Sequence, residues 1–422
     1  MKKSNQKMKF IMNSILKNLF HKKLKKMISS KSFFKKYQAQ TTDNPLGIEI
    51  KKASGCYIYD INNKKYLDLI AGVSACSLGH SNKNVLKAIK KQLKKYLHVM
   101  VYGEFIQNET VLLCKLISEN VPKPLQTTYL TNSGTEAIEG ALKLAKRVTG
   151  RAEIISAKNS YHGSTMGAMS VMGFEERISA YRPLVPGTKH IAYNSFDDIK
   201  KISKNTAAVI LESIQGGAGF IEPKKNYLNE VKKQCEKTGA LLILDEIQPG
   251  IGRTGKLFSF SYHDVVPDIL VIGKGLGGGL PVGAFIASEK NMSKLKFSPI
   301  LGHITTFGGN PLISAACRTT LQTIILSKLI ENTIVKEKIF RDMLIHPLIK
   351  KINGKGLMLA LIMDSEKSAK SLVKIALENG VILFFLLFES KAVRITPPLI
   401  ISESEVRKAC KIIIYCLNKI KC

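Results

Sequence analysis

Short apolar runs alternate with amphipathic segments through the middle of the chain. Runs of strand length occupy residues 127–131, 153–157, 190–193, 207–211, 241–244, 269–272 and 282–287. Helical spacing of apolar residues fills several of the intervals between them. Strands that alternate with helices are typical of a mainly parallel sheet, because parallel neighbours need a crossover connection. The pattern therefore predicts an α/β domain built on a mainly parallel, seven-stranded sheet.

The segments on either side of this region follow other patterns. Residues 48–69 alternate and contain the turn signals Ser54-Gly55 and Asn62-Asn63, which predicts a small antiparallel meander. Helices are predicted at residues 85–97, 109–120, 365–379 and 403–419, together with a long helical pattern from Pro311 to about residue 344. Further strands are predicted at residues 357–363, 381–387 and 392–395. The dense apolar stretch 381–388 suits a buried strand, and the C-terminal part is expected to form a smaller α+β domain.

These patterns suggest four regions along the 422 residues. Residues 1–42 hold many lysines and no acidic residue, which indicates a basic N-terminal extension. Residues 43–100 are expected to contribute to the small domain, residues 101–315 to form the large domain, and residues 316–422 to complete the small domain.

The formal net charge of +32 raises the question of a nucleic-acid or membrane partner. The basic residues are 55 lysines and only nine arginines, they are spread along the whole chain, and tryptophan is absent. Specific readers of nucleic acid use arginine forks and stacked aromatic rings. We interpret the charge as solvated helix faces and expect no nucleic-acid partner.

The eight cysteines stand singly, without a CxxC pair or a metal-type spacing. This usage is typical of reduced thiols in a cytoplasmic protein and predicts no metal site. No apolar run approaches the ~18 residues needed to span a bilayer, so no membrane partner is expected.

Two apolar runs lead to charged residues that carry candidate chemistry. Asp245 ends the run 241–244, Lys274 closely follows the run 269–272, and glycine-rich turns come after both. Ligands of open parallel sheets bind at the carboxyl ends of the strands, so the two side chains are expected to face one crevice. A poorly solvated lysine has a lowered pKa and offers a free amine to a carbonyl group. A solvent-facing lysine is the commoner arrangement, and other residues have to decide between the two.

Three further clusters complete a candidate site. In TNSGTEAIE, Ser133 and Glu136 form a capping box, and the free amides of Ser133, Gly134 and Thr135 would hold a phosphate. The sequence Tyr161-His162-Gly163 offers an aromatic ring after a strand, and HITTFGGNP offers the hydroxyl of Thr306. A phosphate site, an aromatic plate, an acid and an amine are what a ring cofactor with a phosphate tail and an aldehyde requires.

With these motifs the chain resembles the class III aminotransferases, pyridoxal-phosphate enzymes of fold type I, over roughly residues 43–420. The resemblance is carried by TNSGTEA, YHG, the E-x-I-Q-G of residues 212–216, LDEIQPGIGRTG, GKGLGGGLPVG, TTFGGNP and RITPPL. It implies a large cofactor domain with a small α+β domain, pyridoxal 5′-phosphate as the cofactor, and a homodimer with a shared active site.

The resemblance also implies the two catalytic residues. Lys274 would hold the cofactor as a Schiff base and then move a proton between substrate and cofactor. Asp245 would pair with the pyridine nitrogen and keep it protonated.

The other roles that the resemblance implies concern binding. Gln248 would contact the ring hydroxyl, and Tyr161 would stack on the ring with His162 beside it. Ser133, Gly134 and Thr135 would bind the phosphate in one subunit, with Thr306 reaching it from the partner. Arg394 in RITPPL would bind a substrate carboxylate with two hydrogen bonds.

The substrate is less closely specified. Related aminotransferases of ornithine and 4-aminobutyrate usually carry a glutamate where this chain has Gly217, and many have an arginine where it has Ser164. The nearest motifs are those of acetylornithine, succinylornithine and ornithine aminotransferases, which implies transfer of a terminal amine to 2-oxoglutarate in arginine biosynthesis. The alternatives are a different donor such as 4-aminobutyrate, an aminomutase or decarboxylase on the same fold, and a non-enzymatic basic binding protein.

Overall fold

The structure is a computed structural model that describes residues 30–420. Contacts divide the described residues into one unit of residues 30–52 and 58–65 and another of residues 53–57 and 66–420. Among the described residues, the smaller unit holds α2 (Ser30–Tyr37) and most of β1 (Ile50–Ser54) and β2 (Tyr57–Asp60). Most of the predicted basic extension, residues 1–29, lies outside the described residues, and the predicted four-region division stays a prediction.

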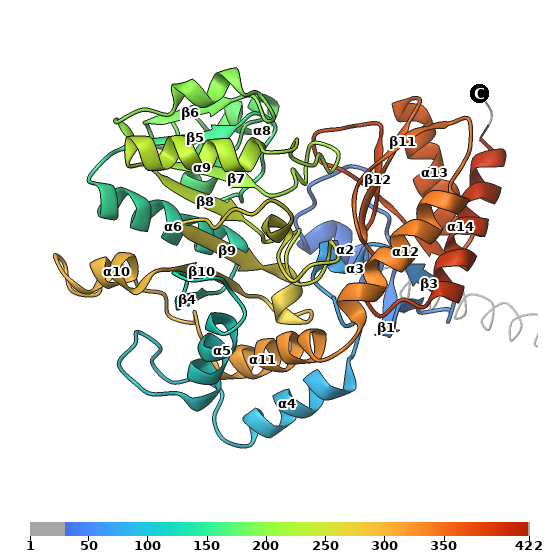
Figure 1. Cartoon of the computed structure of the whole chain (residues 1–422). Helices are drawn as coiled ribbons and strands as arrows, with labels where there is room; N and C mark the ends of the chain where they lie inside the picture. The colour runs from blue at the N-terminus through green and yellow to red at the C-terminus, as the bar shows by residue number, and fades with distance from the viewer. Residues whose placement is uncertain (1–29, 421–422) are drawn as a thin grey trace, which may run out of the picture. The chain divides into compact units, whose positions relative to one another are not determined.

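The larger unit contains the predicted seven-stranded sheet, in the order β4-β10-β9-β8-β7-β5-β6 (Figure 1). Its strands are β4 (Thr127–Thr131), β5 (Glu153–Ala157), β6 (Thr188–Ile191), β7 (Thr206–Glu212), β8 (Leu241–Asp245), β9 (Ile269–Gly273) and β10 (Gly283–Ala287). Strand β10 pairs antiparallel with β4 and β9, and the other neighbouring pairs are parallel. The parallel strands β7, β8 and β9 therefore end at one edge of the sheet.

Helices cover both faces of this sheet, which explains why its central strands β7, β8, β9 and β10 are largely apolar. Along β8, Leu242 and Leu244 pack in one core with the helix α9 (Tyr227–Thr238). Ile243 points to the other face and packs in a second core with α6 (Gly134–Thr149). The central strands are thus enclosed, and their ends are the places where polar side chains meet a cavity.

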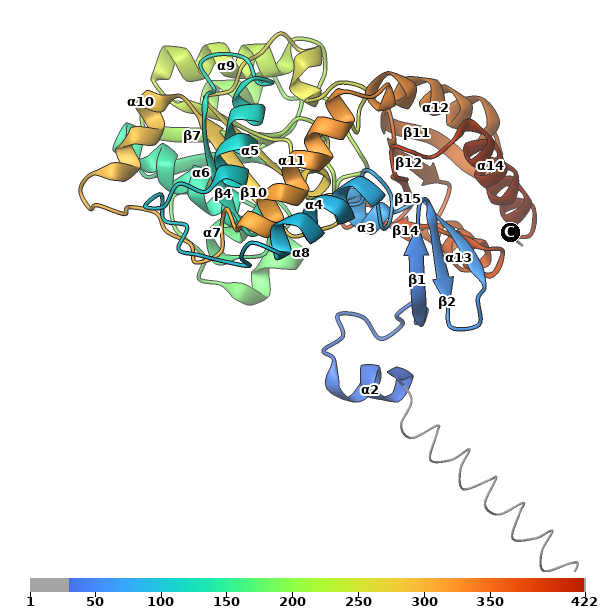
Figure 2. The same ribbon diagram turned by 90° about the horizontal axis from the view of Figure 1, so that it is seen from below.

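A layer of three helices packs beside the sheet: α4 (Lys83–Leu93), α5 (Asn108–Ser118) and α11 (Pro311–Ile325) (Figure 2). The prediction of one long helix after Pro311 is wrong, because α11 ends before a second helix, α12 (Leu329–Met343), begins. Between them the Ser327 hydroxyl accepts the N–H of Leu329 at 3.4 Å. A serine that bonds the backbone in this way favours a new helix start over continuation.

The C-terminal part forms a second, antiparallel sheet in the order β11-β12-β15-β14. Its strands are β11 (Ile349–Lys355), β12 (Met358–Met363), β15 (Ala392–Ile395) and β14 (Phe384–Phe385). The helices α12, α13 (Glu366–Glu378) and α14 (Glu403–Asn418) pack around it (Figure 1). Strand β11 was not predicted, because its sequence IKKINGK has little apolar character.

The predicted buried strand at residues 381–388 is also wrong. Strand β13 (Val381–Ile382) pairs with β3 (Lys65–Asp68), whereas β14 pairs with β15, so the chain changes sheet within a few residues. The side chains of Phe384 and Leu387 remain 41% and 38% exposed. Apolar composition alone could not distinguish a core strand from one that lines a cavity.

The remaining elements are short. They are α3 (Ala71–Ser74), α7 (Met166–Ser170), α8 (Glu175–Ile178), α10 (Glu289–Met292), η1 (Ser179–Tyr181), η2 (Asp197–Lys201), η3 (Ser259–Tyr262), η4 (Lys274–Gly277) and η5 (Ser293–Lys296). None of the helices in residues 30–420 has the length and apolar character that a bilayer span requires.

The contact between α6 and β10 gives a test of this packing. A Cβ atom at Gly140 would lie 2.3 Å from the ring of Phe285, which is fully buried and stacked on Tyr129. Gly140→Ala should therefore lower the free energy of unfolding by about 1–2 kcal/mol, although alanine favours a helix by about 1 kcal/mol.

Urea denaturation measures this change, and Phe285→Leu supplies the control background because it removes ring atoms. In that background Gly140→Ala should be neutral or stabilising. Stabilisation by Gly140→Ala in the wild-type background would contradict the described packing.

Candidate active site

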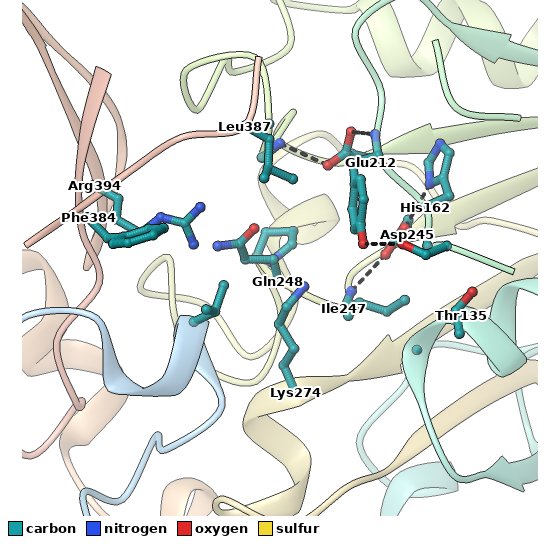
Figure 3. A pocket seen from close by; sticks show the side chains of 18 residues that line it. Thr135, His162, Glu212, Asp245, Ile247, Gln248, Lys274, Phe384, Leu387 and Arg394 are labelled. Atoms are coloured by element: carbon teal, nitrogen blue, oxygen red, sulfur yellow. Dashed lines mark hydrogen bonds and ion pairs between the residues drawn. The ribbon is translucent and has the colours of Figure 1, made fainter. Parts of the chain in front are cut away.

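A cavity of about 420 Å³ lies at the carboxyl ends of β7, β8 and β9 (Figure 3). Eight of the predicted site residues line it: Gly134, Thr135, Tyr161, His162, Asp245, Gln248, Lys274 and Arg394. The other lining residues are Val73, Gly163, Ser164, Glu212, Gly216, Gly217, Ile247, Pro249, Phe384 and Leu387. Two predicted residues, Ser133 and Thr306, are not among the lining residues of the described chain.

Asp245 is the last residue of β8 and is 4% exposed. Its Oδ2 lies 2.8 Å from Nδ1 of the buried His162, and its Oδ1 accepts the N–H of Ile247 at 3.0 Å. Each carboxylate oxygen can accept a second hydrogen bond. The acid is thus held rigidly and keeps acceptor capacity toward the cavity.

Lys274 follows β9 directly and has a φ of +38°, which is strained for a residue with a Cβ. The turn is fixed by the glycines around it and directs the amine into the cavity (Figure 3). Burial lowers the pKa of the Lys274 amine, the carboxylates of Asp245 and Glu212 oppose this, and the Arg394 guanidinium adds to it. A lowered pKa provides more of the unprotonated, nucleophilic amine.

The N-terminus of α6 forms another wall of the cavity. The Ser133 hydroxyl accepts the N–H of Glu136 at 3.3 Å, and the N–H of Ala137 begins the helical hydrogen bonds by donating to the carbonyl of Ser133. In this arrangement the backbone N–H groups of Gly134 and Thr135 come before the first hydrogen bond within the helix and have no acceptor in it. The helix dipole adds positive potential at the same place, which favours an anion.

Tyr161 and Glu212 are linked on the wall next to β7. Glu212 accepts the N–H of Tyr161 at 3.1 Å and the N–H of Gly216 at 2.8 Å. The Tyr161 hydroxyl lies 3.1 Å from the hydroxyl of Ser164. The sequence predicts Glu212 at a strand end beside the site and leaves a direct role open, and in the structure it lies opposite Asp245 on the neighbouring strand.

Arg394 extends from β15 and is 5% exposed. Its Nε donates to the carbonyl of Phe385 at 3.0 Å, whereas its buried Nη1 has no partner within the described residues. Burial lowers the pKa of the guanidinium to about 10, so it remains charged at neutral pH. An unpaired, buried cation in a cavity points to an anionic ligand group.

Gly217 and Ser164 both line the cavity, so the two positions that differ from related sequences lie at the site itself. A Cβ atom at Gly217 would lie 2.6 Å from the ring of Phe388, which occupies the space of a side chain there. Arg182, considered as a substitute cation, instead pairs with Glu175 at 2.7 Å on the surface. Within the described residues that line the cavity, Arg394 and Lys274 are the cations.

Sequence reasoning did not assign the apolar lining residues Val73, Ile247, Pro249, Phe384 and Leu387 to the site. Ile247 and Pro249 lie within the DEIQPG motif and could have been found from their neighbours. The other three carry no local signal, because they reach the cavity only through the tertiary fold.

Comparison with known proteins agrees with this geometry. The family described as aminotransferase class-III matches residues 37–417. An acetylornithine aminotransferase of Caldanaerobacter subterraneus subsp. tengcongensis is 37% identical over 92% of this chain and 99% of its own length. An acetylornithine aminotransferase of Clostridium acetobutylicum is 38% identical over 86% of this chain and 94% of its own. The solved ornithine aminotransferase of Toxoplasma gondii, with PLP at partial occupancy in its active site, superposes with a TM-score of 0.86 at 32% identity and covers 92% of this chain and 93% of its own.

Glu212 gives the site a measurable pH dependence. Burial raises the pKa of Glu212 to about 7, with Asp245 adding to the rise and His162 opposing it, whereas the ordinary value is 4.5. Between pH 4.5 and about 7 the native state therefore keeps a proton that the unfolded chain releases. The stability that depends on this proton is fully present below the pKa of the unfolded state and is lost as the pH rises through about 7.

We expect Glu212→Gln to remove this dependence. Between pH 4.5 and 7.5 the free energy of unfolding of the wild type should fall by about 1–3 kcal/mol relative to the variant. Chemical denaturation at four pH values measures the difference, and parallel curves for the two proteins would contradict it.

Proposed function

We propose, because this chain belongs to the class-III aminotransferases, that it transfers the terminal amino group of acetylornithine or a related diamino acid to 2-oxoglutarate. The single observation that carries the proposal is the convergence of a low-pKa lysine, a buried acid, an anion-binding helix end and an unpaired arginine on one cavity.

The residues present fit pyridoxal 5′-phosphate, the cofactor of this family. The free amides of Gly134 and Thr135 suit its phosphate, and Asp245 has acceptor capacity left for a protonated ring nitrogen. Tyr161 offers its ring for stacking, and the Gln248 amide, which lines the cavity beside Gly216, would be available to a ring hydroxyl. When bound, the cofactor supplies an electron sink for the bond that loses its proton.

The chain's own residues then have distinct tasks. We assign to Lys274 the covalent anchoring of the cofactor aldehyde and afterwards the transfer of a proton on Nζ, which its lowered pKa favours. Asp245, fixed by His162 at 2.8 Å, would place its carboxylate against a protonated ring nitrogen and stabilise it. Arg394 orients the substrate through its carboxylate, and Phe384, Leu387 and Val73 give the cavity an apolar wall.

The donor follows from relatives and from the charge of the cavity. Both acetylornithine aminotransferases that the chain resembles match it over most of their length. Among the described lining residues, Arg394 is the cation that remains for a substrate carboxylate when Lys274 holds the cofactor. An amino donor with one carboxylate and a neutral acylated amine therefore suits the charge of the cavity better than a donor with additional charged groups. We place the reaction in arginine biosynthesis and in the cytoplasm, where the seven free cysteines of the described chain would stay reduced.

We also propose a homodimer with a shared active site. Thr306 is exposed and lies outside the cavity of its own chain. Large apolar side chains close to it in sequence or in space are exposed, among them Leu97 (61%), Ile106 (94%), Ile300 (79%) and Phe307 (55%). The segments meet, since the rings of His98 and Phe307 are 4.7 Å apart. Such a concentration of apolar surface supports an interface from which Thr306 would reach the partner's phosphate site.

The first test of the function is the removal of the amine. Lys274→Ala should lower glutamate formation from acetylornithine and 2-oxoglutarate by at least about 10³-fold, because it removes both the anchor and the proton carrier. The variant should still bind the phosphorylated cofactor, since the amides of α6 are unchanged. Lys290→Ala, which removes an exposed lysine on α10, is the matched control and should keep full activity.

Equal activity of Lys274→Ala and the wild type would refute the assignment. Consumption of the donor by the wild type without glutamate would instead indicate an aminomutase or a decarboxylase.

The second test concerns the carboxylate site. Arg394→Lys keeps a positive charge but loses the two-pronged geometry, so we expect the KM for 2-oxoglutarate to rise about 10–100-fold with a smaller change in kcat. Arg182→Lys, at a surface arginine paired with Glu175, serves as control and should change neither constant. An unchanged KM in Arg394→Lys would remove Arg394 from the substrate site.

A further inference from the structure

A row of hydrogen bonds leads from the cavity wall to a carboxylate behind it. Thr135 Oγ1 lies 2.8 Å from Thr165 Oγ1, and the Thr165 hydroxyl is hydrogen-bonded to Oε1 of Glu139. Thr135 lines the cavity, whereas Thr165 and Glu139 are not among its lining residues. The site assigned above uses none of the groups beyond Thr135.

The number of hydrogens in this row is fixed. Each hydroxyl has one hydrogen to donate, and an ionised carboxylate has none. When Glu139 is ionised it accepts the hydrogen of Thr165, so the contact between the two threonines must use the hydrogen of Thr135. The N–H of Thr165 also donates to Thr135 Oγ1, at 3.3 Å. The Thr135 hydroxyl, unlike the backbone amides of Gly134 and Thr135, would therefore present oxygen lone pairs to an anion as long as this row is kept.

We propose that Glu139 takes up one proton from solvent when a phosphate-type anion binds beside Thr135, which makes Glu139 a positioning residue for that anion. The proton forms an O–H bond at Glu139, which donates to Thr165; Thr165 then donates to Thr135, and Thr135 to the anion. No bond to the anion forms or breaks, and the hydrogen bonds only reverse their direction. Identification of the anion as the cofactor's phosphate rests on the proposed function.

The surroundings of Glu139 are built to hold its side chain in place. The N–H of Ala168 in α7 donates to the same oxygen, Oε1, at 3.0 Å. A Cβ atom at Gly167 would lie 2.2 Å from Oε2, so only glycine leaves room for the carboxylate there. These contacts alone would make Glu139 a cap of α7, and a capping role by itself would involve no proton uptake.

Other ionisable groups lie on α6 and on the elements packed against it. Lys143, one turn further along α6, lies 2.9 Å from Nδ1 of His303, and burial lowers the pKa of that histidine to about 4, so His303 is neutral. The remaining ionisable groups on elements packed against α6 are Tyr129, Glu212, Asp245, Glu289, Lys290, Lys294 and Lys296. Helix α7 contributes none.

Sulfate is a suitable probe, because it is a dianion that does not titrate near neutral pH and every proton taken up must bind to the protein. Its binding to the full-length, cofactor-free chain would be measured by calorimetry at pH 7.5 in two buffers of different ionisation enthalpy. The variants are Glu139→Gln, which cannot be ionised, and Thr165→Val, which interrupts the row and leaves Glu139 in place.

Glu136→Gln is the matched control. Glu136 is on the same helix, but its carboxylate accepts the N–H of Asn132 at 2.7 Å. Competition by pyridoxal phosphate identifies the sulfate site, and circular dichroism verifies that each variant is folded.

The wild type and Glu136→Gln should take up about one proton more per sulfate than Glu139→Gln and Thr165→Val. The Kd for sulfate should also rise with pH. This rise should be steeper in the wild type than in Glu139→Gln, by a factor of up to about ten per pH unit. Equal proton counts in all four proteins, with normal competition by pyridoxal phosphate, would overturn this inference alone. Failure of pyridoxal phosphate to compete would overturn the proposed function together with it.

Discussion

The parallel pairing of β7, β8 and β9 is the constraint on which the site depends. Their register places Glu212 opposite Asp245 and brings Lys274 to the same edge within one turn of the chain. Three ionisable groups are thereby held close together in a buried place, where water cannot compensate their charges. Each must find a partner in the fold, and the surrounding hydrogen bonds follow from this requirement.

The groups meet this requirement in different ways, and the differences define the chemistry. Asp245 is held by His162 and a backbone amide, and Glu212 by two backbone amides. Lys274 responds to burial with a lowered pKa. Arg394 keeps a buried nitrogen without a partner among the described residues, so a ligand has to complete the charge balance. The unpartnered nitrogen of Arg394 and the lowered pKa of Lys274 are therefore both consequences of one low-dielectric cavity.

Local signals in the sequence were sufficient for the sheet and for the residues at its strand ends. The runs before Asp245 and Lys274 are strands, and Ser133 caps a helix as predicted, because each depends on neighbouring residues alone. The predicted capping box is incomplete, since the Glu136 carboxylate accepts the N–H of Asn132 instead of that of Ser133. The stretch 381–388 could not be predicted in this way, since its exposure depends on pairing with β3 and β15, which are remote in sequence. The same holds for Phe388, whose ring fills the space next to Gly217. These parts of the cavity wall and its surroundings depend on long-range contacts, which motifs of neighbouring residues do not record.

The central claim, that Lys274 alone among 55 lysines anchors an aldehyde cofactor, can be tested by covalent trapping. The protein would be incubated with pyridoxal 5′-phosphate at low excess and reduced with borohydride, and the modified peptides identified by mass spectrometry. The account predicts stoichiometric modification of the peptide that contains Lys274, because its amine has a lowered pKa and lies beside a phosphate site. Modification spread over the surface lysines, with Lys274 unmodified, would contradict it.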